Sequence, residues 1–168
     1  TADVLHGAFG AVKINPQNPD MAYAGTGGKL LKTSDGGATW QTIFTETDFW
    51  AQEIYINGAT PDIVLVASER GLLRSTDGGV SWTKLWNANT WGVKAKPGAP
   101  NTVWCIRDNG NGADFMISTD AGETFNPSAA PMWTPTGNRQ VTGAIIAPCP
   151  SKSDKVYAFL SGEGDALG

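Results

Sequence analysis

Three aspartates recur at an almost constant interval and are the first residues in this chain that could do chemistry. Asp35, Asp77 and Asp120 lie about 42 residues apart, each two positions after Thr or Ser and two positions before a glycine. Such carboxylates could act as general acids or bind calcium. Alternatively, each could accept hydrogen bonds from backbone N–H groups of its own turn. Because every repeat carries the phrase and a catalytic group is normally needed once, the sequence favours this structural interpretation.

Two further positions of the phrase are constant in character. One is a glycine, which can adopt a positive φ without a Cβ clash, and the other is an aromatic residue, which can pin the turn to the sheet below. The glycines are Gly37, Gly79 and Gly122, and the aromatic residues are Trp40, Trp82 and Phe125. We expect these residues and the three aspartates to be structural.

The phrase, as in Thr33–Trp40, resembles the Asp-box, or BNR, repeat. That repeat occurs in sialidases, xyloglucanase-type glycoside hydrolases, sortilin-type receptors, a photosystem II assembly factor and secreted bacterial surface proteins. The resemblance covers nearly the whole chain and implies an all-β fold, a β-propeller with blades of four antiparallel strands. It also implies that the phrase lies between the third and fourth strands of a blade, away from the ligand face.

The segments around the phrases read as short strands rich in Val, Ile, Tyr and Trp, and no window has helical spacing. The expected first strands are Ala11–Asn15, Glu53–Asn57, Gly92–Lys96 and Gly143–Ala147. The second are Met21–Ala24, Ile63–Ala67, Thr102–Ile106 and Lys155–Leu160. The third are Lys29–Lys32, Leu72–Arg74 and Phe115–Ile117. The fourth are Trp40–Phe44, Trp82–Trp86 and a weak one near Thr124–Asn126.

These strands divide the chain, 1–168, into blades at about 8–45, 50–87 and 90–127, with an incomplete fourth blade at about 140–168. A propeller ring must close, and about three and a half blades leave open edges. We therefore expect a fragment of a larger propeller, with the remainder supplied by the same protein or by a second chain.

Two segments break the repeat. The hairpin Asp108–Asp114 is longer than its counterparts, and the connector Pro127–Gln140 is long and rich in proline. Insertions in repeat proteins often map to a functional face, although loops also lengthen at little energetic cost.

A ligand of a propeller binds at the channel mouth, where the residues before each first strand gather. Phe9, Trp50 and Trp91 occupy nearly equivalent positions there and could stack on sugar rings. The alternative is that these rings wedge neighbouring blades together as core. Polar residues near them are His6, Asp48, Gln52, Asn89, Arg139 and Gln140. Arg139 joins the three aromatic residues as a candidate for ligand binding.

Catalysis has less support. The arginines Arg70, Arg74, Arg107 and Arg139 do not fall where a sialidase triad would need them. Asp48 and Glu53 lie near the expected mouth and could be half of the carboxylate pair of a xyloglucanase-type hydrolase. Their catalytic role is the weaker hypothesis.

The composition of the chain excludes some classes of binding partner. The net charge is −4 and the basic residues are scattered, which argues against nucleic acid. No stretch is long and apolar enough to insert in a membrane. Cys105 and Cys149 are expected at opposite ends of a blade, which disfavours a disulfide, and neither a metal site nor a cofactor is expected. The resemblance then favours a secreted or cell-surface binding or scaffolding protein that contacts protein or glycan, with a glycoside hydrolase acting on β-glucan as the alternative.

Overall fold

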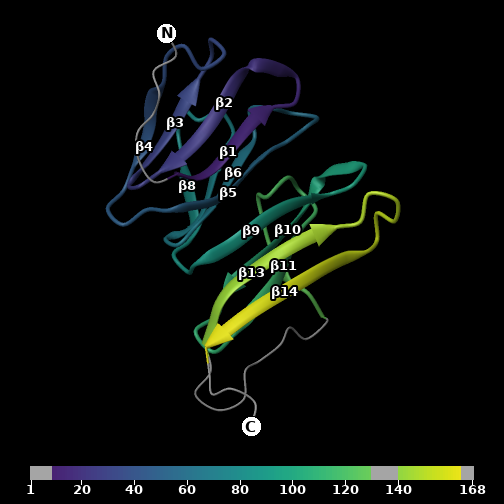
Figure 1. Cartoon of the computed structure of the whole chain (residues 1–168). Helices are drawn as coiled ribbons and strands as arrows, with labels where there is room; N and C mark the ends of the chain where they lie inside the picture. The colour runs from purple at the N-terminus through teal and green to yellow at the C-terminus, as the bar shows by residue number, and fades with distance from the viewer. Residues whose placement is uncertain (1–8, 130–139, 164–168) are drawn as a thin grey trace.

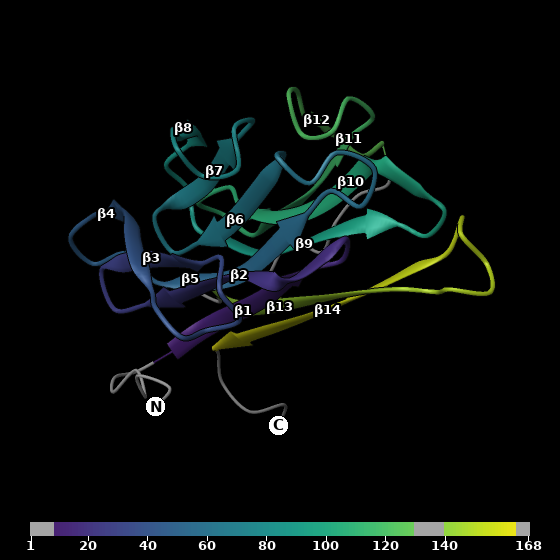
Figure 2. The same ribbon diagram turned by 90° about the horizontal axis from the view of Figure 1, so that it is seen from above.

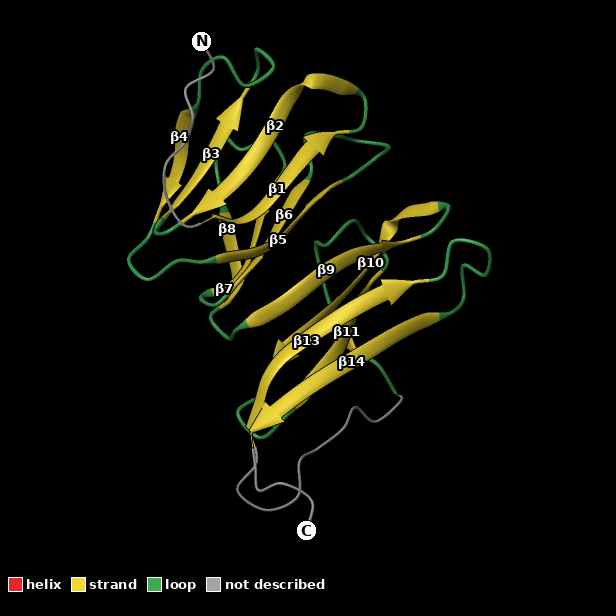
Figure 3. Cartoon of the chain, in the orientation of Figure 1, coloured by secondary structure: helices red, strands yellow, loops and turns green. Residues whose placement is uncertain are grey.

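The computed structural model describes residues 9–129 and 140–163 and places them in four antiparallel sheets. In the three larger sheets each strand pairs with the next one along the chain. The strands of the described part are drawn in Figure 3, which contains no helix. The expected all-β architecture is confirmed for these residues.

The bounds of the strands follow the repeat. The first sheet holds β1 (Phe9–Asn15), β2 (Asn18–Thr26), β3 (Lys29–Thr33) and β4 (Gln41–Thr45). The second holds β5 (Ala51–Ile56), β6 (Val64–Ser68), β7 (Gly71–Ser75) and β8 (Thr83–Trp86). The third holds β9 (Thr90–Lys96), β10 (Ala99–Asp108), β11 (Ala113–Ser118) and β12 (Asn126–Pro127). The fourth pairs β13 (Gln140–Pro148) with β14 (Val156–Glu163).

Two details of the expected strands are corrected. Trp40 and Trp82 each precede the fourth strand of their sheet, because the repeated turn ends only after its aromatic residue. In the third sheet the weak fourth strand is the two-residue β12, shifted to Asn126–Pro127.

The sheets follow one another in an arc, with the first sheet and the β13–β14 pair at its two ends (Figures 1 and 2). The first strands β1, β5, β9 and β13 contact one another in that order. An irregularity in the pairing near the start of each first strand repeats around the arc, between Phe9 and Ala11 in β1 and between Ala51 and Glu53 in β5. Sheets stacked in this way resemble propeller blades, whose inner strands surround a channel.

The core lies between the sheets. One cluster joins the first and second sheets through residues such as Tyr23, Leu30, Ile54 and Val66. Two more clusters join the second sheet to the third and the third to the fourth. Alternate residues of a strand point to opposite faces, so each middle sheet contributes to two clusters. Burial between sheets therefore holds the arc together.

Cys105 is fully buried on β10 and Cys149 is half-buried, and neither forms a disulfide among the described residues. Desolvation raises the pKa of the Cys105 thiol well above its ordinary range, although Arg107 opposes the shift. No helix in the described part of the chain could cross a membrane.

Candidate functional site

The three repeated turns share one pattern of hydrogen bonds, as the first turn illustrates. The Thr39 amide donates to Asp35 Oδ1 at 2.9 Å, and the Thr39 hydroxyl donates to Oδ2 at 2.6 Å. The Thr33 hydroxyl donates to the same carboxylate and accepts from the Gly37 amide. Both carboxylate oxygens of Asp35 are thus engaged by its own turn.

Asp77 and Asp120 accept the equivalent hydrogen bonds from Ser81 and Thr124. Hydrogen bonds from the Thr39 and Ser81 hydroxyls, then from the amides of the same residues, lower the pKa values of Asp35 and Asp77 to about 2. For Asp120, desolvation raises the pKa, but the hydrogen bonds from Thr124 and Ser118 together outweigh it and lower the pKa to about 2. A carboxylate held ionised by its own turn is poorly suited to donate a proton.

A candidate site is a cleft of about 570 Å³ where the sheets converge. Its amides come from the second and third sheets and its hydroxyls from the fourth, whereas its aromatic residues come from all three of these sheets. The lining is Gly10, Trp50, Gln52, Glu69, Asn89, Trp91, Thr142, Gly143, Ala144, Ile145, Phe159, Leu160 and Ser161. The cleft can therefore offer aromatic faces and neutral hydrogen-bonding groups, and Glu69 is the one charged residue among the described residues that line it.

The structure brings two of the sequence-predicted aromatic residues to this cleft. Trp50 is half-buried, immediately before β5, whereas Trp91 is 7% exposed and packs with Ile106 in the core between the third and fourth sheets. Trp91 Nε1 is buried without a hydrogen-bond partner in the described part of the chain. Trp50 thus presents more of its ring to a ligand than Trp91 does.

The other predicted positions are only partly described. Phe9 and Gln140 begin β1 and β13, but their side chains lie outside the described structure. His6 and Arg139 also lie outside the described residues.

A pair of side-chain amides crosses from one sheet to the next at the cleft. Gln52 Nε2 donates to the Asn89 side-chain oxygen Oδ1 at 2.8 Å, and the backbone carbonyl of Asn89 accepts from the Asp108 backbone amide at 2.8 Å. The Gln52 and Asn89 side chains are therefore held in place before any ligand arrives, which reduces the entropy lost on binding.

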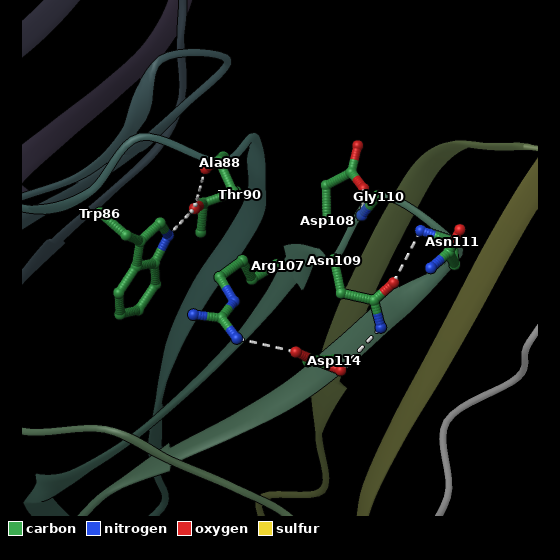
Figure 4. Close-up of polar contacts among 9 residues, drawn as sticks. All are labelled: Trp86, Ala88, Thr90, Arg107, Asp108, Asn109, Gly110, Asn111 and Asp114. Atoms are coloured by element: carbon green, nitrogen blue, oxygen red, sulfur yellow. Dashed lines mark hydrogen bonds and ion pairs between the residues drawn. The ribbon is translucent and has the colours of Figure 1, made fainter.

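The Asp108 amide belongs to the long hairpin Asp108–Asp114 noted in the sequence. Side-chain hydrogen bonds hold this hairpin in one conformation (Figure 4). Arg107 donates to Asp114 at 2.8 Å, while its guanidinium lies 5.3 Å from the Trp86 ring centroid. Asn109 donates to the second oxygen of Asp114. Although desolvation opposes it, the hydrogen bond from Arg107 lowers the pKa of Asp114. The hairpin thus supports Asn89 beside the cleft.

The two candidate acids are placed differently. Asp48 is exposed, has a φ of 56°, and pairs with Arg70 at 2.7 Å. Glu53 accepts from the Val93 amide at 2.9 Å and pairs with Lys94, so it bridges the second and third sheets. Neither residue lines the cleft.

Charged residues gather at a second, smaller cleft of about 410 Å³, lined by Glu46, Thr47, Arg70, Lys84 and Asn87. Lys84 pairs with Glu46 at 2.5 Å, and Arg70 pairs with Asp48. The charges at this smaller cleft are therefore largely compensated by ion pairs within the protein. No group of three His, Cys, Asp or Glu side chains able to hold a metal ion occurs within residues 9–129 and 140–163.

Comparison with known proteins adds information on the fold. No family model and no curated protein matches the sequence. An ancestral GH74 enzyme is similar to 72% of this chain, with a TM-score of 0.63 and 17% identity, over 18% of its own length. An auxiliary nutrient binding protein from Bacteroides thetaiotaomicron is similar to 92%, with a TM-score of 0.63 and 12% identity, over 36% of its length.

YCF48 bound to D1 peptide is similar to 72% of this chain, with a TM-score of 0.54 and 19% identity, over 40% of its length. These structures are propellers, and four-stranded sheets in an arc are what they share with this chain. The described part of the chain has the fold of a partial β-propeller. At these identities the likeness concerns the fold alone, and this chain spans less than half the length of each of the three.

The propeller places at the cleft several residues that the sequence reasoning did not find. Thr142, Ser161 and Phe159 come from β13 and β14 and have no phrase or spacing that marks them. Gly10 was also missed. A Cβ there would lie 1.9 Å from the Ala51 carbonyl oxygen, so only glycine allows β1 and β5 to approach this closely.

Proposed function

We propose that this chain is part of a secreted or cell-surface β-propeller that binds a glycan in the cleft between its sheets. The observation that carries the proposal is the cleft lining, which combines the Trp50 ring with the fixed Gln52–Asn89 amide pair. A flat aromatic face suits the apolar side of a sugar ring, and amides and hydroxyls suit its hydroxyl groups.

Two further features support a binding propeller. The repeated turns match the Asp-box pattern, which we infer to be structural here because their carboxylates are engaged locally. Among the similar structures, one is an auxiliary nutrient binding protein and another is YCF48 bound to D1 peptide. A protein segment is therefore the second ligand class to test, and the remaining blades of a ring are expected partners.

The binding proposal is tested by calorimetric titration of the whole chain with cello- and xyloglucan oligosaccharides. Trp50→Ala should weaken binding by about tenfold, or ~1.4 kcal/mol. Gln52→Ala should weaken it to a smaller extent, because Asn89 then loses its fixed partner. Val80→Ala is the control, since Val80 is 82% exposed on the second turn, outside the cleft.

Equal affinity of Trp50→Ala and wild type, with both folded, would contradict a glycan site at this cleft. Thermal unfolding of each variant identifies any loss that reflects misfolding. Binding of peptides but of no oligosaccharide would assign the cleft to a protein ligand.

The alternative is a glycoside hydrolase of the xyloglucanase type, which the likeness to GH74 enzymes brings into consideration. The geometry favours it less, because Asp48 and Glu53 are both engaged in ion pairs away from the cleft. Hydrolysis of xyloglucan that is lost in Asp48→Asn would establish the enzyme instead.

A further inference from the structure

Asparagine precedes glycine at three places in the chain, Asn57–Gly58, Asn109–Gly110 and Asn111–Gly112. In such a pair the backbone nitrogen of the glycine can attack the side-chain carbonyl carbon of the asparagine and expel ammonia. Glycine favours this attack because it has no Cβ to obstruct the approach and its backbone adjusts freely. The asparagine side chain must turn toward the next backbone nitrogen, so the folded structure decides which of the three pairs reacts.

The first pair is protected, because Asn57 is fully buried and its side chain is held at both ends. Asn57 Nδ2 donates to the Pro100 carbonyl at 3.3 Å and to Asn101 Oδ1 at 2.9 Å. Asn57 Oδ1 accepts from the backbone amides of Ala59 at 2.8 Å and Thr60 at 3.1 Å. Rotation of this side chain would leave buried polar groups unpaired, which costs free energy.

The second pair lies in the long hairpin, where Asn109 is exposed but also held at both ends (Figure 4). Asn109 Nδ2 donates to Asp114 Oδ1 at 2.8 Å, and Asn109 Oδ1 accepts from the Asn111 backbone amide at 3.0 Å. The backbone nitrogen of Gly110 is fixed as well, since it donates to Asp108 Oδ1 at 2.7 Å. Both reacting groups are therefore restrained as long as the hairpin stays closed.

The third pair differs, because the Asn111 side chain is exposed and makes no hydrogen bond within residues 9–129 and 140–163 (Figure 4). The bond from the Asn111 backbone amide to Asn109 Oδ1 fixes the main chain but leaves the Asn111 side chain free to rotate. Gly112 is buried, but the attack is intramolecular and needs no solvent at its nitrogen. Water is needed only afterwards, at the carbonyl carbon of the exposed Asn111 side chain.

We propose that Asn111 is a site of spontaneous deamidation in the folded protein. The Gly112 nitrogen forms a bond to Asn111 Cγ and the Cγ–Nδ2 bond breaks. The side-chain nitrogen leaves as ammonia and takes the proton of the Gly112 nitrogen with it, so that a cyclic succinimide remains. Water then opens the ring at either carbonyl and gives aspartate or isoaspartate, with no oxidation or reduction.

The reaction would change the hairpin in charge and in length. It adds a negative charge to a hairpin that already carries Asp108 and Asp114. The isoaspartate product also routes the main chain through the side-chain carbon, which lengthens the connection between β10 and β11. The proposal does not depend on a glycan ligand, since Asn111 does not line the cleft.

Ageing of the full chain in mildly alkaline buffer, followed by acidic pepsin digestion and tandem mass spectrometry, tests this. In the folded protein Asn111 should convert at least about tenfold faster than Asn57 or Asn109. Gly112→Ala should slow the conversion of Asn111 by at least about tenfold, because the added Cβ obstructs the attack. Gly58→Ala is the matched control, since a Cβ there meets no atom within 4 Å, and it should leave the rate at Asn111 unchanged.

Unfolding in urea separates the effect of the fold from that of the local sequence. It should accelerate the conversion of Asn57 by at least about tenfold and that of Asn111 much less, because only Asn57 is released from hydrogen bonds. Circular dichroism verifies that each variant is folded. Equal rates at the three asparagines in the folded protein, slower conversion at Asn111 than at Asn109, or equal acceleration of Asn57 and Asn111 in urea would each overturn the proposal.

Discussion

The aspartates of the repeated turns combine a chemical property with a structural role. Asp35 and Asp77 are exposed, yet hydrogen bonds from their own turns hold their pKa values near 2. The lowering of each pKa arises from three residues of the same turn, Thr33, Ala38 and Thr39 in the case of Asp35, and needs no other part of the fold. An ionised carboxylate therefore stabilises each turn over most of the pH range.

This depression predicts acid sensitivity with a definite sign. The folded pKa lies below the ordinary 3.8, so the turns contribute stability above about pH 4 and lose it as the pH falls toward 2. Asp77→Asn should lower the urea midpoint at about pH 5. The difference from wild type should shrink toward about pH 2, where the wild-type carboxylate is protonated. A difference that is constant with pH would show that the charge does not stabilise the turn.

Between elements, two separate factors can require glycine two positions after the aspartate: a positive φ and a close approach to the neighbouring sheet. Gly37 and Gly79 both have a positive φ, of 91° and 89°. Only Gly79 also faces a neighbouring sheet, where a Cβ would lie 2.9 Å from Ile43 Cδ1 and 3.2 Å from the Tyr23 ring. The energetic cost of backbone strain at a positive φ can therefore be measured separately from that of overpacking against the neighbouring sheet.

Gly79→Ala should destabilise the protein by about 2 kcal/mol or more, because strain and overpacking add. Gly37→Ala should cost about 1 kcal/mol from the backbone alone. Gly58→Ala is the control, since Gly58 has no positive φ and no atom within 4 Å of an added Cβ. Urea unfolding measures all three. Equal losses at Gly79 and Gly37 would show that the turn does not dock on the preceding sheet.

For the whole molecule, polar bridges between sheets supplement the apolar clusters. Glu53 joins the second and third sheets through the Val93 amide and Lys94. We expect Glu53→Ala to lower the free energy of unfolding by about 1 kcal/mol, because the side chain is partly exposed and solvent screens the ion pair.

Hydrogen exchange checks the location of that effect. The Val93 amide should lose protection in Glu53→Ala, because its acceptor is removed. Glu123→Ala is the control, since it removes the same charge from an exposed position on the third turn. Unchanged protection of Val93 would mean that the bridge contributes nothing to holding the two sheets together.

The sequence by itself determined the repeat, the strands and the chemistry of the turns. These follow from residues close together in the chain: the Asp35 hydrogen bonds span four positions, and strand alternation is a local property. The same information predicted Trp50 and Trp91 just before their first strands; Trp50 does precede β5, Trp91 is instead the second residue of β9, and both line the cleft.

The tertiary structure alone decided what those residues face. Glu53 bridges two sheets, Trp91 is mostly core, and the cleft takes Thr142, Ser161 and Phe159 from a sheet with no marking phrase. Such contacts join residues about forty or more positions apart, so they depend on how the twisted sheets pack side by side. Local spacing carries no information about that packing, which is why the lining of the cleft became apparent only from the fold.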